Sequence, residues 1–234
     1  MPRAPRHAKG GLVYHLLNRA NGRSIIFRRE GDYLAFERIL VEAKERCAMR
    51  IVAYCVMPNH WHLVVWPRRD GDLSVFLHWL TLTHAQRWQA AHDRVGGGHL
   101  YQGRFKSFPV QTDEHYLTVC RYVEQNPVRA RLVRRAQDWR WSSAWRRLAW
   151  DPDAAKLLSA GPLDLPEGRQ WLALVNRPVE GQDLERVHTS IKRGRPLGQE
   201  SWLGRIARML QLESTLRPRG RPRKETAEGD KKGT

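Results

Sequence analysis

The fold is decided by the stretch Val56-Met57-Pro58-Asn59-His60-Trp61-His62-Leu63-Val64-Val65-Trp66. One apolar run ends before its Pro-Asn corner and another follows it, which predicts two short strands joined as a hairpin. Because successive strand residues point to opposite faces, His60 and His62 share one face and the tryptophan between them takes the other. Two neutral imidazoles held in this way can bind a divalent ion together with a third ligand, although a bare His-x-His pair is more often two ordinary histidines.

The composition is strongly basic. The 234 residues include 41 Lys+Arg against 24 Asp+Glu, which gives a formal net charge of +17 and a pI of about 10.7. Such an imbalance concentrates polyanions near the surface and predicts salt-sensitive binding, with nucleic acid as the leading partner. The ten tryptophans suit stacking on unpaired bases, but core packing is their more common role.

Cysteine usage and hydropathy indicate a cellular compartment. Cys47, Cys55 and Cys120 have neither Cys-x-x-Cys spacing nor an even count, which favours buried thiols in a reducing environment over disulfides or a zinc site. The basic N-terminus does not resemble a signal peptide, and no run approaches the roughly 20 apolar residues that span a bilayer. We therefore expect a soluble cytoplasmic protein that needs no membrane.

Hydrophobic periodicity predicts the element order strand, helix, strand, strand, helix, strand, helix. Besides the hairpin, strands are expected at 12–18 and 105–111, and helices at 32–49, from Asp72 or Ser74 to 95, and at 113–125, where Asn126-Pro127 ends the last one. The order lacks the long crossovers of a doubly wound sheet. It predicts an α+β class for residues 11–130, namely a ferredoxin-like antiparallel sheet with helices packed on it.

The flanking segments differ in composition from this domain. Residues 1–10 are expected to form a flexible basic arm, 131–190 an Arg/Trp-rich helical extension, and 191–234 a basic, partly disordered tail with a short helix near 200–212. Arginines interleave with tryptophans between 129 and 147. Either these side chains contact phosphates and unstacked bases, or the arginines face solvent while the tryptophans turn inward, and the sequence favours neither.

A second motif, Tyr122-Val123-Glu124-Gln125-Asn126-Pro127, lies at the end of the third predicted helix. At about 100° per residue, Tyr122 and Asn126 lie roughly 40° apart around the axis, so the phenol and the amide share one face. Tyr116 is displaced from Tyr122 by about 240° and is expected to be a packing residue. A nucleophile and an oxygen ligand opposite two imidazoles are the parts required for metal-assisted attack on a phosphodiester.

Together, Met57-Pro58-Asn59-His60-Trp61-His62 and the stretch from Arg121 to Ala130 resemble the motifs of the REP-associated tyrosine transposases, which belong to the HUH superfamily with a single catalytic tyrosine. The resemblance spans about residues 10 to 150. It implies a ferredoxin-like domain that cuts single-stranded DNA by transesterification at repeated palindromic (REP) hairpins. One position departs from the family pattern, because Ala20 stands where a glycine is expected in the first loop.

The resemblance also implies roles for particular residues. Tyr122 would attack the scissile phosphate to give a 5′-phosphotyrosine, and His60, His62 and Asn126 would hold Mg²⁺ or Mn²⁺. The implied partners are single-stranded DNA and DNA hairpins, with no small-molecule substrate, and a monomer is favoured over a dimer. The candidate DNA contacts are the basic residues Arg3, Arg6, Lys9, Arg121, Arg129 and Arg134.

Two other classes of function explain part of the sequence. A non-catalytic DNA-binding protein, such as a repressor or repeat-binding factor, accounts for the charge but leaves the coincidence of the two motifs unexplained. A hydrolytic metal-dependent nuclease would use bound water in place of Tyr122. Replacing Tyr122 with Phe separates these classes, since it abolishes cleavage by the transposase and leaves cleavage by the hydrolase largely intact.

Overall fold

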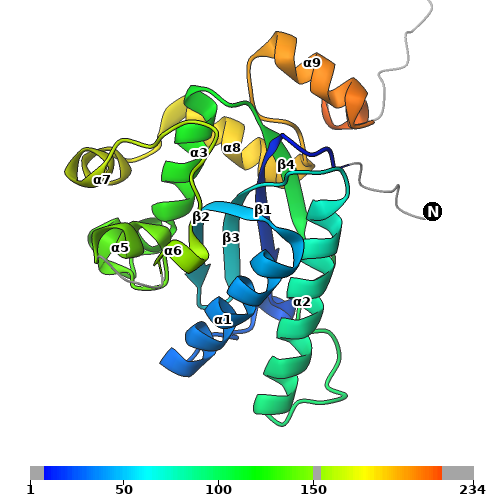
Figure 1. Ribbon diagram of the computed structural model, residues 1–234, viewed down its shortest axis with the longest axis vertical. Helices are drawn as coiled ribbons and strands as arrows, with labels where there is room; N and C mark the ends of the chain where they lie inside the picture. Colours follow the sequence, from blue (N-terminus) through cyan, green and yellow to red (C-terminus); the bar gives the residue numbers. More distant parts are fainter. Residues whose placement is uncertain (1–7, 150–153, 218–234) are drawn as a thin grey trace, which may run out of the picture.

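The computed structural model describes residues 8–149 and 154–217, and its centre is a four-stranded antiparallel sheet (Figure 1). The strands are β1 (Val13–Arg19), β2 (Arg50–Met57), β3 (His60–Trp66) and β4 (Lys106–Val110), in the order β2-β3-β1-β4. Each neighbouring pair is antiparallel. Because β3 lies between β1 and β2 and is antiparallel to both, β1 and β2 run in the same direction. This arrangement confirms the predicted α+β, ferredoxin-like fold class.

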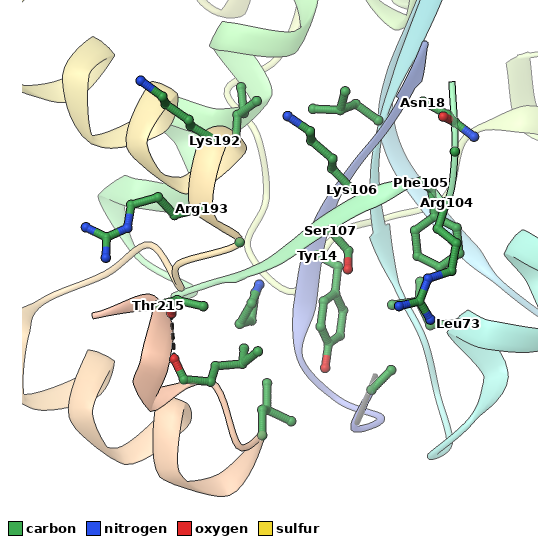
Figure 2. Close-up of a pocket in the computed structure, with 18 of the residues that line it drawn as sticks. Tyr14, Asn18, Leu73, Arg104, Phe105, Lys106, Ser107, Lys192, Arg193 and Thr215 are labelled. Carbon is green, nitrogen blue, oxygen red and sulfur yellow. Dashed lines mark hydrogen bonds between the residues drawn. The ribbon is translucent and has the colours of Figure 1, made fainter. Parts of the chain in front are cut away.

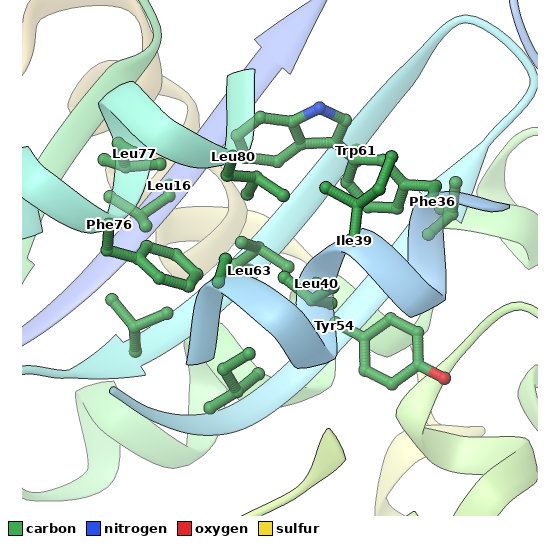
Figure 3. Packing of buried hydrophobic residues seen from close by; sticks show 14 of the residues in the cluster. Leu16, Phe36, Ile39, Leu40, Tyr54, Trp61, Leu63, Phe76, Leu77 and Leu80 are labelled. Atoms are coloured by element: carbon green, nitrogen blue, oxygen red, sulfur yellow. The ribbon is translucent and has the colours of Figure 1, made fainter. Parts of the chain in front are cut away.

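Helices α1 (Glu30–Cys47) and α2 (Asp72–Ala91) cover one face of the sheet (Figure 1). Their apolar stripes meet the side chains of β1, β2 and β3 in a single buried cluster, and each fully buried Leu or Phe contributes roughly 1.5–3 kcal/mol. Figure 3 shows the centre of this cluster, formed by Leu16, Phe36, Ile39, Leu40, Trp61, Leu63, Phe76, Leu77 and Leu80.

The start of α1 differs from the prediction by two residues. The helix begins at Glu30, and Asp32, which was expected to be the cap, occupies the third helical position. From there its carboxylate accepts the backbone N–H groups of Arg28 and Arg29, at 2.8 and 3.0 Å. This is the reciprocal half of a capping box, in which the acidic side chain reaches back to the residue before the helix.

The opposite face is covered by α3 (Glu114–Glu124) and by helices of the C-terminal extension (Figure 1). Helix α3 ends at Glu124, which confirms the predicted helix end before Asn126-Pro127. The chain then forms one further helical turn, α4 (Asn126–Arg129), because a proline near the start of a helix needs no hydrogen-bond donor there. Asp113 caps α3 by accepting the N–H of His115.

The extension completes the second core. It contains α5 (Ser143–Leu148), α6 (Ala154–Leu157), α7 (Gly168–Val175), α8 (Gly181–Arg193) and α9 (Glu200–Met209), with short 3-10 turns at Ala136–Asp138 and Glu213–Thr215. A further 3-10 turn, at Asn21–Arg23, follows β1. Trp171 of α7 and Val187 of α8 are buried in the same cluster as Val64 of the sheet. Residues beyond 130 therefore pack directly on the face that carries His60 and His62.

The Arg/Trp stretch turns its first two tryptophans inward. The indole N–H of Trp139 donates to the carbonyl oxygen of Val56 at 2.9 Å, and the ring of Trp141 stacks on Tyr33 with centroids 4.6 Å apart. Ala20 has φ −60°, a value open to any residue, so this loop does not require the expected glycine there. In the described part of the chain, no helix is both long and apolar enough to cross a membrane.

Candidate active site

The two histidines of β3 lie side by side on the face that is covered by α3. Their ring centroids are 5.0 Å apart and the rings are nearly perpendicular. In the antiparallel register of β1 and β3, Arg19 lies opposite His60 and Leu17 lies opposite His62. Because directly opposed residues share a face of the sheet, the side chain of Arg19 extends on the same face as the imidazoles.

Each of these imidazoles has one nitrogen engaged with a neighbour. Nδ1 of His60 lies 2.6 Å from Oδ1 of Asn59, and an amide oxygen can only accept, so this nitrogen carries the proton. Nδ1 of His62 lies 3.0 Å from Nε2 of His15, a fully buried residue of β1 that the sequence motifs did not single out. These contacts leave Nε2 of His60 and Nε2 of His62 as the candidate ligand atoms.

The histidine cluster is neutral at physiological pH. Burial lowers the pKa of His15 to about 3 and that of His60 to about 4, and the nearby guanidinium groups of Arg19 and Arg129 act in the same direction on His60. The pKa of His62 is held well below its ordinary value, first by burial and then by the adjacent imidazoles. A neutral imidazole keeps the lone pair that a metal ion requires.

Tyr122 of α3 lies over this cluster. Its ring is edge-on to the ring of His62, with centroids 6.0 Å apart, and the residue is only 5 % exposed. The guanidinium carbon of Arg129 lies 3.8 Å from the centroid of the phenol ring, and an N–H of the same group donates to the carbonyl oxygen of Tyr122 at 2.9 Å. Burial raises the pKa of Tyr122, while the positive charges of Arg129 and Arg19 oppose that rise.

The two amide residues after Tyr122 differ in what they contact. The amide nitrogen of Asn126 donates to the carbonyl oxygens of Tyr122 and Val123, both at 3.1 Å, so its oxygen is the atom that can act as a ligand. Gln125 instead donates to the carbonyl oxygens of Val175, at the end of α7, and of Arg177 just after it, and it accepts the N–H of Val179 at 3.1 Å. Gln125 therefore holds the extension in place, and Asn126 is the amide associated with Tyr122.

His188 is a functional candidate that the sequence reasoning missed. It projects from α8, and its ring lies edge-on to the ring of Tyr122 with centroids 5.9 Å apart. The residue is exposed, and its pKa is lowered by partial burial and by the charge of Arg129. No motif spacing connects α8 with α3, so the sequence contained no signal for this contact.

The predicted DNA contacts have different surroundings. Arg121 donates to the carbonyl oxygens of Leu174 and Arg177, at 3.0 and 2.9 Å, and so fastens α7 to α3. Lys9 forms an ion pair with Asp70 at 2.6 Å. Arg134 is exposed, and Arg129 lies at Tyr122 as described above. Arg3 and Arg6 lie outside the described residues.

A second group of potential metal ligands lies at the start of α3. Ligand atoms of Asp113, Glu114 and His115 lie within 4.8 Å of one another. The carboxylate of Asp113 accepts the backbone N–H of His115 at 2.9 Å and lies 2.8 Å from Nδ1 of its ring. These bonds are accounted for by capping of the helix, without a metal ion.

Comparisons with known proteins place the chain in a family. Residues 8–126 match the family model described as "Transposase IS200 like". Over 147 residues the chain is 25% identical to the REP-associated tyrosine transposase of Escherichia coli (strain K12), covering 61% of this chain and 82% of that protein. A solved structure described as a REP-associated tyrosine transposase bound to a REP hairpin shares the fold, with a TM-score of 0.52 and 23% identity over 72% of this chain and 97% of that one. Since the family model spans more than half of the sequence and includes both the histidine pair and the tyrosine motif, the chain belongs to the IS200-like transposase family.

Proposed function

We propose that this protein is a single-strand DNA transposase that cleaves and rejoins DNA at REP hairpins by transesterification through Tyr122. The observation that carries the proposal is the approach of Tyr122, on α3, to the paired imidazoles of His60 and His62, on β3. The similarity to a REP-associated tyrosine transposase supports the same substrate class, as does the solved relative that is bound to a REP hairpin.

The reaction exchanges one phosphodiester for another. The phenol oxygen of Tyr122 bonds to the scissile phosphorus, the bond from phosphorus to the 3′ oxygen breaks, and that oxygen leaves as a 3′-hydroxyl after taking up a proton. The product is a 5′-phosphotyrosine, which conserves the phosphodiester linkage. The 3′-hydroxyl of another strand can therefore reverse the step and join DNA without ATP.

The phenol must lose its proton as it attacks. An ordinary tyrosine has a pKa near 10, and burial raises the pKa of Tyr122 further, so a base is needed at neutral pH. We assign this role to His188, since partial burial and the charge of Arg129 lower its pKa and so favour the neutral imidazole, and its exposure lets it pass the proton to solvent. Arg129, lying over the phenol ring, stabilises the developing negative charge.

The residues present fit a divalent metal ion. His60 and His62 offer neutral imidazoles, each with its Nδ1 engaged, and Asn126 offers an amide oxygen, which together are nitrogen and oxygen donors of the kinds that Mn²⁺ or Mg²⁺ accepts. His60, His62 and Asn126 would hold the ion. When bound, it would polarise the phosphate as a Lewis acid.

The proposal extends to partners and location. A net charge of +17 suits single-stranded DNA and DNA hairpins as partners, because neutralised phosphates release counterions. Arg134 is exposed and free to meet the backbone of such a hairpin, whereas Arg121 serves packing. We propose that the protein acts as a monomer on DNA in the bacterial cytoplasm, associated with the nucleoid.

The test is a denaturing gel of the protein with labelled single-stranded hairpins taken from repeats beside its own gene, in Mn²⁺ or in EDTA. We expect a labelled, protein-sized band that requires Mn²⁺ and disappears in Tyr122→Phe. Tyr116→Phe is the matched control, since it removes a hydroxyl from a buried tyrosine of the same helix and should leave the band intact. Cleavage that persists in Tyr122→Phe would show that water is the nucleophile and refute the proposal.

A further inference from the structure

A cavity of about 700 Å³ opens along the β4 edge of the sheet. One side is formed by β1, β4 and the segment 102–105, and the other by the end of α8 and the turn that follows α9. Figure 2 shows Arg193 and Arg104 on its two sides, Lys106 and Lys192 at one end, and Tyr14 and Ser107 between them. We call this cavity the β4 groove.

The β4 groove is lined by positive charge. Its basic residues are Arg19, Arg104, Lys106, Lys192 and Arg193, and no Asp or Glu lines it among the described residues. None of these five side chains forms an ion pair within residues 8–149 and 154–217. Nε of Arg19 is moreover buried without a hydrogen-bond partner in that part of the chain. A guanidinium N–H that makes no bond within the protein is available to a phosphate oxygen, which it binds with a charge-assisted hydrogen bond.

The groove adjoins the candidate active site through Leu17 and Arg19 of β1, which line it. In the sheet register, Lys106 lies opposite Leu17, and Leu17 lies opposite His62, so the three residues form one row across β4, β1 and β3. Two strand spacings place the backbone of Lys106 about 10 Å from that of His62. Arg19 lines the groove and also lies opposite His60, so it occupies the boundary between the groove and the histidine pair.

We propose that the β4 groove binds the unpaired DNA segment that flanks the scissile phosphate, with Arg19 at the phosphate nearest the histidines. This inference rests on the proposed function. The volume lies in the range of small-molecule sites, so a few unpaired nucleotides fit and a duplex does not. Lys and Arg heads along such a groove contact the phosphate backbone and contribute affinity without base specificity.

The test measures binding alone, by fluorescence anisotropy of a labelled twelve-nucleotide oligothymidylate in EDTA, over a range of KCl concentrations. The groove variant is Arg104→Ala/Arg193→Ala. The matched control is Arg38→Ala/Arg94→Ala, which removes two exposed arginines from α1 and from the loop after α2, outside the groove. Both pairs lower the net charge equally, so the control reports the general effect of charge.

For single strands, each lost phosphate contact flattens the slope of log K against log salt by about 0.7. Losing two contacts should therefore reduce the slope by about 1.4 and weaken binding about 25-fold at 0.1 M salt. The control should keep the slope of the unmodified protein. Equal losses in both variants, or an unchanged slope in the groove variant, would overturn the proposal.

A twelve-base-pair duplex of the same sequence identifies the form of DNA. Its affinity should be equal for the groove variant and the control, and a loss confined to the groove variant would show that the cavity contacts duplex instead. Because this binding needs no chemistry, its result stands even if Tyr122 forms no covalent adduct. Conversely, normal adduct formation together with an unaffected groove variant would refute the groove and leave the transposase function in place.

Discussion

Acidification is expected to destabilise this protein below pH 6.5, because several histidines are buried in the neutral form. His84 of α2 is 2 % exposed, and its Nδ1 accepts a hydrogen bond from the hydroxyl of Tyr101 at 2.6 Å, which itself accepts one from Trp61. Burial lowers the pKa of both His84 and His15 to about 3. In the unfolded chain both titrate near 6.5. The unfolded state therefore binds more protons below that pH, and stability is lost progressively as the pH falls toward 3.

The size of the effect follows from linkage. At pH 5 each of these two histidines should cost about 2 kcal/mol of folding free energy, because the unfolded form is almost fully protonated and the folded form is not. Together His15 and His84 should remove about 4 kcal/mol, against a total stability of roughly 5–15 kcal/mol for a native protein. For a chain of this length, that corresponds to a decrease in Tm of about 8–16 °C.

The assay is thermal unfolding followed by circular dichroism at pH 7.5, 6.5, 5.5 and 5.0. The variant His84→Gln lacks one of the two buried histidines. Between pH 7.5 and pH 5 its free energy of unfolding should therefore fall by about 2 kcal/mol less than that of the unmodified protein. His78→Gln, at an exposed position of the same helix, should keep the pH dependence of the unmodified protein. Equal Tm values at pH 7.5 and pH 5, or an unchanged pH dependence in His84→Gln, would refute the reasoning.

Three further predictions concern the site and its support. The buried indole N–H of Trp171 donates to the carboxylate of Glu124 at 2.7 Å. Glu124→Ala leaves this N–H without an acceptor and should lower the free energy of unfolding, measured in urea, by about 3 kcal/mol. A loss under 1 kcal/mol would contradict this. His60→Ala should abolish Mn²⁺ binding measured by electron paramagnetic resonance while changing DNA affinity in EDTA by less than about twofold, since phosphate contacts dominate affinity; retained Mn²⁺ binding would remove His60 from the ligand set. His188→Ala should slow formation of the tyrosine adduct about 10²- to 10⁴-fold without altering Mn²⁺ affinity, and an unchanged rate would assign the proton to another base.

Local patterns predicted the elements well where neighbouring residues control them. The Pro-Asn corner and the two apolar runs produce the β2-β3 hairpin, because strand alternation and turn chemistry act over a few residues. Element ends were less accurate. Asp32 caps α1 from inside the helix, and Pro127, which follows the end of α3 as predicted, also opens a further helical turn that was not predicted. In both cases one side chain is compatible with two backbone positions, and the surrounding contacts select between them.

The site was predicted in part. His60, His62, Tyr122 and Asn126 belong to compact motifs, so their chemistry could be inferred before their positions were known. The contacts of His15, His188 and Arg19 could not, because these residues are distant in sequence from both motifs and carry no spacing signal. The arginines illustrate the same limit, since Arg121 donates to carbonyl groups in the last turn of α7 and just after it, and Arg129 lies over Tyr122. An exposed cation and a packing cation look identical in a sequence.

Residue types and their short spacings were sufficient to predict the fold class and to single out the histidine pair and the tyrosine as site candidates, because each pattern lies within one or two elements. Only the folded chain determines which imidazoles contact Tyr122 and which cations line the β4 groove. It also determines how α7 and α8 complete the second core. These features join side chains from separate elements. They depend on the burial and packing of the complete sheet, and no local segment encodes them.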